Sequence, residues 1–596
     1  MKLSVFISFA LIDAGVSFST PQLPSARLAS VRWGSKSSSV SLSSTPVAID
    51  PSAVSETTNG AEQARDAERR KDEDDEEENS SRIRPIHQNW WPVSTTFALD
   101  KTRPNPVDLL NKKLVLFWSE SDNEWKCLDD RCSHRFAPLS EGRIVNNSNG
   151  GGCLQCAYHG WEFDGKGSCT KVPQADRVGS VGRPVTGYPV RVEASMIFVW
   201  ADPASYETLG QSITVPTFPT LTEAVEERGD QICFMRDLPY GYELLGENLL
   251  DLSHLPFSHH GVGNLKRDLG GPLPFRMLPA SERSDDNPLY EAFLEDAGTT
   301  DPTFKSFAAP VPDASLHLGF YDPCHVRYTR QRVAGDASTT NYVALYLCPT
   351  TTNKSRVFLF NLFPKRPVPP KMTKLQRVKS WVTPADIKQK VTAMVFARLF
   401  TPVFSHLISH KIFDGDGIFL HKQGDRMARS GLSFKDYDTP SSADVMVNKF
   451  RRYGDAAAKR TRELGLDTLA ETVAPTSGYD DSLLRSEMLD RYESHTKNCR
   501  ICTEALEKAR TKKRRLAIFE MALIGAAGAS SMTLAGSLGL FLMSSTVKVP
   551  SVLVKGAAGA TLSCIGGCKL ISKMKPKVEK EINQFLFEDY VHAEKN

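Results

Sequence analysis

The sequence predicts an α+β protein made of a small antiparallel β domain, a larger α+β domain and a C-terminal pair of apolar helices. Three observations support this fold class. Between about residues 87 and 205, short apolar runs alternate with Gly, Asn and Asp turns, as in small antiparallel β domains. From about 206 to 465, strand-like and helix-like stretches are mixed, which is typical of α+β domains. Two apolar stretches follow, and the first, 521–547, runs for 27 residues without a charge.

Length and composition indicate several folded units with polar extensions. The 596 residues exceed one ordinary domain, and 40% are hydrophobic while 24% are charged. The formal net charge of +3 is too small to suggest nucleic acid as a partner. The twelve cysteines fall in small groups: Cys132 with Cys156, Cys499 with Cys502, and Cys564 with Cys568. This grouping favours metal or redox chemistry in a reducing compartment over a disulfide scaffold.

The first fifty residues are expected to be a signal peptide followed by a transit peptide. An apolar run, 3–12, is interrupted by Asp13 and followed by small residues, which resembles a secretory signal. Residues 14–49 contain no acidic residue but several arginines and many serines, as in plastid transit peptides. The junction at 15–18, Gly-Val-Ser-Phe, resembles the two-part leader of algae with complex plastids. The sequence therefore predicts import into a plastid.

Residues 51–86 are expected to form an acidic, disordered linker. The run at 72–78 holds seven consecutive acidic residues, which repel one another and cannot build a core. Order is expected to begin near Asn89, in the segment Asn-Trp-Trp-Pro-Val.

The C-terminal region divides into three parts: 466–515 with a C-x2-C pair, an apolar hairpin at 516–575, and a tail at 576–596. Basic residues at 512–515 precede the first apolar stretch, and further lysines follow or end the second. Basic residues at both outer ends place both ends on the same side of a membrane, which predicts a transmembrane hairpin. A buried helical pair in a soluble domain remains the alternative.

Two short motifs carry cysteine and histidine in alternation. Cys132-Ser133-His134 is followed after 21 residues by Cys156-Ala157-Tyr158-His159, giving C-x-H and C-x2-H. In a Rieske [2Fe–2S] centre, two cysteines hold one iron and two histidines hold the other. Structural zinc is the alternative, but zinc fingers usually group Cys with Cys and His with His. The pattern therefore favours a Rieske cluster held by Cys132, His134, Cys156 and His159.

A second histidine pattern lies downstream. Residues 248–259 read N-x2-D-x2-H-x4-H, with His254 and His259 as the pair. Two imidazoles and one carboxylate bind mononuclear non-haem Fe(II) and leave positions free for O2 and substrate. His260 falls off the spacing and is the poorer candidate.

These motifs and their surroundings resemble a known family. The cluster motifs and their flanks resemble the Rieske domain of ring-hydroxylating oxygenases. Over nearly the whole chain from Trp90, the sequence resembles the pheophorbide a oxygenase family, which includes chlorophyllide a oxygenase, protochlorophyllide-oxidising relatives and the translocon-associated Rieske protein. The segments that carry this resemblance are 89–93, 132–142, 158–163, Glu247-Asn248, the C-x2-C at 499–502, the paired apolar stretches and 589–593.

The resemblance implies roles for further residues. Asp416, followed seven residues later by Gln423, matches the family's pattern for the carboxylate iron ligand, with Asp414 as runner-up. Asp251 resembles the aspartate that joins His159 of one subunit's cluster to His254 of the next, which implies a ring-shaped homotrimer. Asn248 opens the same motif and is grouped with Asp251 as catalytic.

The resemblance also implies a fold and an activity. It implies an all-β Rieske domain at 87–205 and a helix-grip (START-like) catalytic domain at 206–465. The reaction implied is oxidation of a chlorophyll-derived tetrapyrrole by O2, in chlorophyll metabolism or breakdown. Electrons would come from reduced ferredoxin and its reductase. The catalytic domains would lie in the stroma, on the thylakoid or inner envelope membrane.

Several alternatives remain open at this point. In one alternative, the enzyme oxidises another hydrophobic molecule, such as a sterol or carotenoid. In another, the protein is a redox or import-associated component. The set His254, His259 and Asp416 speaks against the latter, because a pure sensor needs no second iron site. The family implies that Cys499 and Cys502 are a redox-regulatory pair addressed by thioredoxin. Half of a metal site with His495 and an incidental pair are the other interpretations.

Overall fold

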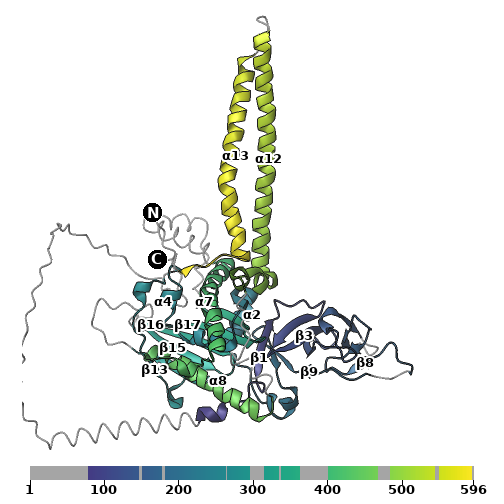
Figure 1. Cartoon of the computed structure of the whole chain (residues 1–596), viewed down its shortest axis with the longest axis vertical. Helices are drawn as coiled ribbons and strands as arrows, with labels where there is room; N and C mark the ends of the chain where they lie inside the picture. Colours follow the sequence, from purple (N-terminus) through teal and green to yellow (C-terminus); the bar gives the residue numbers. More distant parts are fainter. Residues whose placement is uncertain are drawn as a thin grey trace, which may run out of the picture.

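Figure 1 shows the computed structural model, in which two globular parts carry a long pair of helices that rises away from them. The structure describes residues 78–146, 151–177, 182–263, 265–295, 314–334, 337–362, 401–466, 483–543 and 550–592. The expected leader at 1–50 and residues 51–77 of the expected linker lie outside the described residues.

The first globular part is all β, as the sequence predicts. Its strands form three small antiparallel sheets. Strand β11 lies at the centre of its sheet, between β1 and β10. This position fits its apolar sequence, because all side chains of Met196–Trp200 are buried. The three sheets are β1 (Trp90–Thr95), β11 (Met196–Trp200) and β10 (Val190–Glu193); β2 (Asn105–Leu109), β3 (Lys112–Ser119), β4 (Glu124–Asp129) and β9 (Gly187–Tyr188); and β5 (Arg143–Asn146), β6 (Gly152–Gln155), β7 (Glu162–Phe163) and β8 (Cys169–Lys171).

The second part contains a seven-stranded antiparallel sheet covered by helices, which confirms the α+β mixture. Its hydrophobic core is continuous with that of the first part, and Trp91 of β1 packs edge-on against Tyr242 with 5.4 Å between ring centroids. The strands, in spatial order, are β12 (Cys233–Leu238), β18 (Ser355–Leu362), β17 (Ala337–Pro349), β16 (His325–Ala334), β15 (Ala314–Tyr321), β14 (Tyr290–Leu294) and β13 (Phe275–Met277).

The helices of this part bring the catalytic motifs together. They are α2 (Pro219–Arg228), α3 (Tyr242–Leu250), α4 (Leu255–Ser258), α7 (Pro402–Ser430) and α8 (Val445–Glu463). Helix α7 begins where the Thr401 hydroxyl accepts a hydrogen bond from Phe404 N, with Pro402 in its first turn, and it ends at Gly431 in the left-handed region. Helix α8 packs closely on α3, because Gly246 leaves the space that the Phe450 ring occupies.

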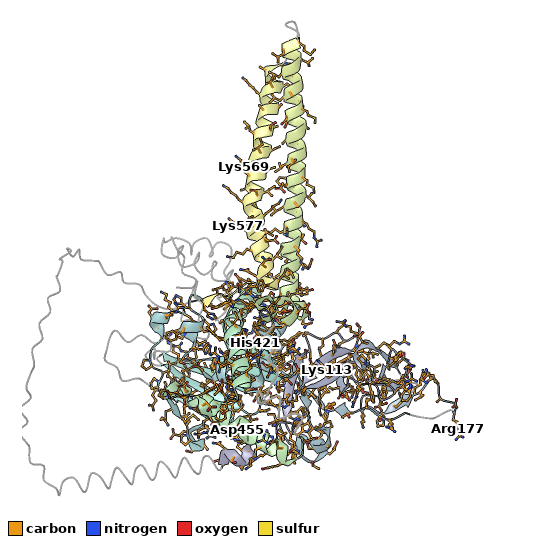
Figure 2. All side chains as sticks on the ribbon, viewed as in Figure 1. Lys113, Arg177, His421, Asp455, Lys569 and Lys577 are labelled. Carbon is orange, nitrogen blue, oxygen red and sulfur yellow. The ribbon has the colours of Figure 1, made fainter. Side chains whose placement is uncertain are left out.

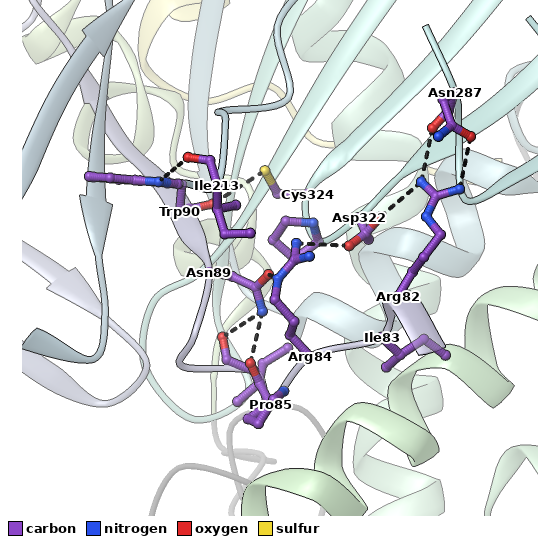
Figure 3. A network of polar contacts seen from close by, with 12 residues as sticks. Arg82, Ile83, Arg84, Pro85, Asn89, Trp90, Ile213, Asn287, Asp322 and Cys324 are labelled. Carbon is purple, nitrogen blue, oxygen red and sulfur yellow. Dashed lines mark hydrogen bonds and ion pairs between the residues drawn. The ribbon is translucent and has the colours of Figure 1, made fainter. Parts of the chain in front are cut away.

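The segment before β1 is ordered earlier than the sequence suggests. Ile83 and Ile86 are buried in the main core, although both belong to the expected linker. Figure 3 shows how polar contacts hold this segment: Arg84 donates to Asp322 at 3.0 Å, and Arg82 donates to Asn287 at 2.9 and 3.0 Å. The expectation that the linker extends to residue 86 is therefore wrong for 78–86, because two buried isoleucines and two paired arginines fix the chain there.

The last two helices are antiparallel and much longer than the apolar stretches alone. They are α12 (Arg500–Met543) and α13 (Ser551–Leu586), so the segment 576–586 of the expected tail is still helical. At the foot of this pair, apolar side chains of both helices pack together, and Lys512 pairs with Glu581 at 2.9 Å. Beyond the foot many apolar side chains are exposed, although the two helices still touch, as where Ser530 Oγ lies 2.8 Å from Thr561 Oγ1. Lys569 and Lys577 mark α13 in Figure 2. Both helices are long and apolar enough to cross a membrane.

Candidate active site

Two tight loops of the first part bring the cysteine–histidine motifs together. The loop at 132–136 follows β4, and the loop at 156–160 joins β6 to β7. Each closes with a backbone hydrogen bond to its cysteine: Phe136 N donates to Cys132 O at 2.9 Å, and Gly160 N donates to Cys156 O at 3.0 Å. Both closing residues are left-handed, with φ of 63° and 73°. The two loops therefore have the same construction, although their sequences differ.

The side chains of these loops are arranged in two pairs. Cys132 and Cys156 are buried in the small core between the sheets. The rings of His134 and His159 lie at the surface side with 4.5 Å between centroids, and Trp161 stacks on His134. No three of the four ligand atoms converge within 4.8 Å, unlike the two groups elsewhere in the described residues that do. Separate sulfur and nitrogen pairs fit a two-iron cluster and do not fit a single zinc ion.

A second site lies where α4 meets α7. His254, His259 and Asp416 bring their ligand atoms together within 4.8 Å. The Nε2 atoms of His254 and His259 lie 3.7 and 3.3 Å from Asp416 Oδ1. His259 is fully buried, and neither of its ring nitrogens makes a hydrogen bond within the described part of the chain. The Nε2 atom of His259, buried without a hydrogen bond and 3.3 Å from a carboxylate oxygen, leaves a lone pair available to a divalent iron.

The electrostatics of this site favour a positive charge. Burial alone would lower the pKa of His254, but the carboxylates of Asp416 and Asp251 raise it to about 9. Burial would likewise raise the pKa of Asp416, but His259 and His254 lower it to about 2. The charged forms are therefore stabilised, and a cation between these three side chains replaces the proton that the imidazoles would otherwise hold.

Neighbouring side chains fix the geometry of the three. Asp251 Oδ2 lies 3.4 Å from His254 Nδ1, on the side of the ring away from Asp416. Asp251 is itself held, because Ser253 donates to its Oδ1 through both N at 2.7 Å and Oγ at 2.5 Å. Asn248 Nδ2 lies 3.3 Å from His254 Nε2. Each of these contacts limits the rotation of the His254 ring.

The structure separates the two aspartates that the sequence left as alternatives. Asp414 is fully buried and is held by two arginines, with Arg236 at 2.7 Å and Arg491 at 2.6 Å. It is not among the ligand atoms that converge with His254 and His259. His260 also lies outside this group, and its Nδ1 accepts a hydrogen bond from Arg267 N at 3.1 Å.

Three residues of the site carry no sequence signal that would have placed them there. Ser258 donates to Asp416 Oδ1 at 2.9 Å. Tyr590, near the C-terminus, donates from its phenol to Ser258 O at 2.9 Å and thereby brings the segment around residue 590 against α4. Gly415 has no side chain because a Cβ there would lie 3.1 Å from His259 Nδ1 and from the Tyr590 ring.

Cys499 immediately precedes α12 and Cys502 lies in its first turn, and neither belongs to the group of His254, His259 and Asp416. Both are free thiols, and Cys502 is fully buried.

Comparison with known proteins matches family models to the Rieske loops and to the segment that includes Asp416. A family model for the Rieske [2Fe-2S] domain matches residues 89–189, and one for pheophorbide a oxygenase matches 320–433, which includes Asp416. A chloroplastic pheophorbide a oxygenase of Oryza sativa subsp. japonica is 31% identical over 454 residues, or 72% of this chain and 74% of the relative. The chain belongs to the pheophorbide a oxygenase family. The Arabidopsis thaliana pheophorbide a oxygenase is 29% identical and covers 85% of this chain and 84% of its own length.

A relative with a different name is nearly as similar. Flavonoid 8-hydroxylase 2 of Ocimum basilicum, also chloroplastic, is 28% identical over 75% of this chain and 78% of its own length. As a member of the pheophorbide a oxygenase family, the chain is a Rieske non-haem iron oxygenase that uses a [2Fe–2S] cluster and a mononuclear iron. The chloroplastic relatives indicate a plastid protein.

Proposed function

We propose that this oxygenase oxidises a chlorophyll-derived tetrapyrrole, using O2 and electrons from reduced ferredoxin. The observation that carries the proposal is the buried group His254, His259 and Asp416, which lies in a chain that resembles pheophorbide a oxygenases over most of its length. An open three-ligand iron site is needed for O2 chemistry and has no use in a protein that only transfers electrons.

In this proposal the four residues of the two loops hold the cluster. Cys132 and Cys156, buried in the small core, would hold one iron of the cluster, and His134 and His159 would hold the other. The cluster supplies electrons one at a time at a potential raised by its neutral imidazoles. Trp161, stacked on His134, keeps that ring in place.

His254, His259 and Asp416 hold the mononuclear iron, which supplies the O2 chemistry. Asp251 orients His254 through Nδ1, so that Nε2 faces the metal. Ser258 orients Asp416 in the same way through Oδ1, and Tyr590 orients Ser258 through its carbonyl. Asp251, Ser258 and Tyr590 thus fix the orientation of two iron ligands, His254 and Asp416.

We further propose that the electron passes between subunits. Figure 1 places α4 and the strands around the cluster, such as β8, on opposite sides of the molecule. His159 is itself partly exposed and lies beside Tyr158, which is 67% exposed, so a second copy of the chain can reach this histidine. Asp251, which already contacts His254, would then join His159 of the neighbouring subunit in a ring-shaped trimer.

The C-terminal helix pair is proposed as the membrane anchor. A stromal catalytic part on the thylakoid or inner envelope would meet hydrophobic substrates where they reside. The leader, with its Gly-Val-Ser-Phe junction, supports import into a complex algal plastid. The seven-stranded antiparallel sheet, with α7 packed against β12, supports a helix-grip (START-like) catalytic domain.

A second candidate substrate is a flavonoid. The observation that supports it is the similarity of this chain to the flavonoid 8-hydroxylase of Ocimum basilicum. The test uses the purified full-length protein with ferredoxin, its reductase and 18O2, offered pheophorbide a, chlorophyllide a or a flavone. Mass spectrometry should show 18O in a tetrapyrrole product, and the Asp416→Ala variant should give none. Label in the flavone with no consumption of either tetrapyrrole would overturn the proposal.

A further inference from the structure

A third group of metal-ligating side chains lies at the foot of the long helix pair, apart from both iron sites. His406, His495, Cys499 and Cys502 bring one ligand atom each to within 4.8 Å of one another. His406 Nδ1 lies 3.4 Å from each of the two sulfurs, and His495 Nε2 lies 3.3 Å from Cys502 Sγ. Three of the four residues are buried, and Cys499 is half-buried.

These separations match those of a tetrahedral zinc site. With Zn–S of about 2.3 Å and Zn–N of about 2.0–2.1 Å, adjacent sulfur and nitrogen ligands of a tetrahedron lie about 3.6 Å apart. The three sulfur–nitrogen distances here are 3.3, 3.4 and 3.4 Å. Two thiolates and two neutral imidazoles also neutralise the charge of Zn²⁺, which removes the cost of burying the ion.

Hydrogen bonds between thiols and imidazoles explain the cluster less well. His406 Nδ1 lies 3.4 Å from both sulfurs, so its single hydrogen or its single lone pair would have to serve two sulfur atoms at once. The other nitrogen of His495, Nδ1, lies 2.6 Å from Met235 O and must carry the proton, because a carbonyl only accepts. The lone pair of His495 Nε2 therefore faces Cys502. A backbone carbonyl that fixes the tautomer of a histidine in this way is common behind metal ligands.

The position of the group suggests what an ion would do there. His406 belongs to α7, ten residues before Asp416, a distance of about 15 Å along the helix. Cys499 immediately precedes α12, Cys502 lies in its first turn, and Met235 belongs to β12 of the large sheet. One ion would tie the helix that presents Asp416 to the foot of the helix pair and to the sheet.

We propose that His406, His495, Cys499 and Cys502 bind a structural Zn²⁺ that fixes the base of the C-terminal helix pair to the catalytic domain. Binding releases the two thiol protons and leaves no open position, so the ion does no chemistry on a substrate. The redox-regulatory role expected for Cys499 and Cys502 is the competing hypothesis, since thiolates held by zinc are not free to form a disulfide.

The test measures metal content and zinc environment in the purified full-length chain. It is made in the Asp416→Ala background, because zinc can also occupy an empty site of two histidines and one carboxylate. We expect about one zinc per chain with two sulfur and two nitrogen neighbours in the X-ray absorption spectrum. Cys502→Ser should lose most of that zinc, while the visible spectrum of the Rieske cluster persists.

The matched control is the double variant Cys564→Ser/Cys568→Ser, which removes two thiols from α13 and should keep the zinc. The absorption spectrum of the protein with all cysteines intact keeps the test valid if Cys502→Ser fails to fold. Zinc in an oxygen-rich environment, iron in the sulfur–nitrogen site, or a Cys499–Cys502 disulfide with no zinc in freshly purified protein would each overturn the proposal. The result does not depend on which substrate the oxygenase takes.

Discussion

Asp414 and Asp416, two residues apart on α7, serve opposite sides of the helix. Two residues correspond to a rotation of about 200° in an α-helix. Asp414 lies between Arg236 and Arg491 at 2.7 and 2.6 Å, whereas Asp416 Oδ1 lies 3.3 Å from His259 Nε2. One carboxylate therefore neutralises buried arginines, and the other faces the pair of histidines.

Substituting these two aspartates should separate stability from iron binding. Asp416→Ala should lose the mononuclear iron while the Rieske cluster and the fold persist. Asp414→Ala removes the carboxylate that both buried arginines contact, although Arg491 keeps Glu588 at 3.2 Å, and should cost about 3–5 kcal/mol of folding stability. Iron analysis and thermal unfolding of both variants make the comparison. Full iron retention in Asp416→Ala would mean that the carboxylate ligand has been assigned wrongly.

Replacing Asp251 tests the path of the electron. Asp251→Asn keeps a side chain that hydrogen-bonds but removes the negative charge beside His254 Nδ1. We expect a reducible cluster and a loaded iron site, with turnover lower by about a hundredfold, at the upper end of such effects. Electron paramagnetic resonance of the cluster and product formation are measured on the same preparation. Near-normal turnover would exclude the proposed role of Asp251.

The hydroxyl of Tyr590 should contribute to iron retention. Tyr590→Phe removes the donor to Ser258 O and leaves that buried carbonyl without it, at a cost of about 1 kcal/mol. If the substitution destabilises the iron-bound state by this free energy, iron should pass to a chelator about fivefold faster. Tyr492→Phe, at an exposed position of the same domain, is the control. Equal release from both variants would show that the C-terminal segment does not support the site.

The parts of the site that sequence could predict are those in which contacting residues are close in the chain. The loops of Cys132 and Cys156 each hold their ligands within a few residues, and His254 and His259 share one short loop. Tyr590 and Ser258, in contrast, are 332 residues apart, and His406 and Cys499 are 93 apart. Spacing carries no information about such contacts. The choice between Asp414 and Asp416 depended on two arginines, one of them on a distant strand, which only the folded chain brings to α7.

The all-β division followed from short apolar runs that alternate with turn residues, and the α+β division followed from a mixture of strand-like and helix-like stretches. The ordered structure of residues 78–86 was not predicted from the sequence. Two isoleucines in this segment form no hydrophobic pattern, and their burial depends on a core that the rest of the chain supplies.

Buried Glu243 should make the stability depend on pH. Burial raises the pKa of Glu243 to about 8, despite the opposing charge of Arg451. The folded protein then keeps a proton that the unfolded chain loses above about pH 4.5, so the free energy of unfolding falls as the pH rises from about 4.5 to about 8. Glu243→Gln should remove this loss, which amounts to at most about 5 kcal/mol. The melting temperature of Glu243→Gln should exceed that of the parent protein by more at pH 8 than at pH 6. For the control Glu223→Gln, at an exposed position, the difference from the parent should be the same at both pH values.

Membrane attachment should depend on the outer part of α12 and α13 alone. Truncating the chain before Lys512 is a poor test, because it also removes Tyr590 and the contacts of Arg491 with Gln584 and Glu588 at the foot. Replacing residues 523–570 by a short Gly/Ser loop keeps both the foot and the tail.

This shortened protein should be extracted from plastid membranes by alkaline carbonate and should still load both iron sites. The reason is that the apolar side chains of the outer segment are exposed, as at Met532 (77%) and Leu562 (70%), whereas those of the foot are packed. The salt bridges Lys512–Glu581 and Lys513–Glu579, at 2.9 and 2.5 Å, remain to pair the helices below the new loop. If the shortened protein still resists extraction, the attachment lies elsewhere in the chain. If it is soluble but loads no iron, the outer helices do more than anchor.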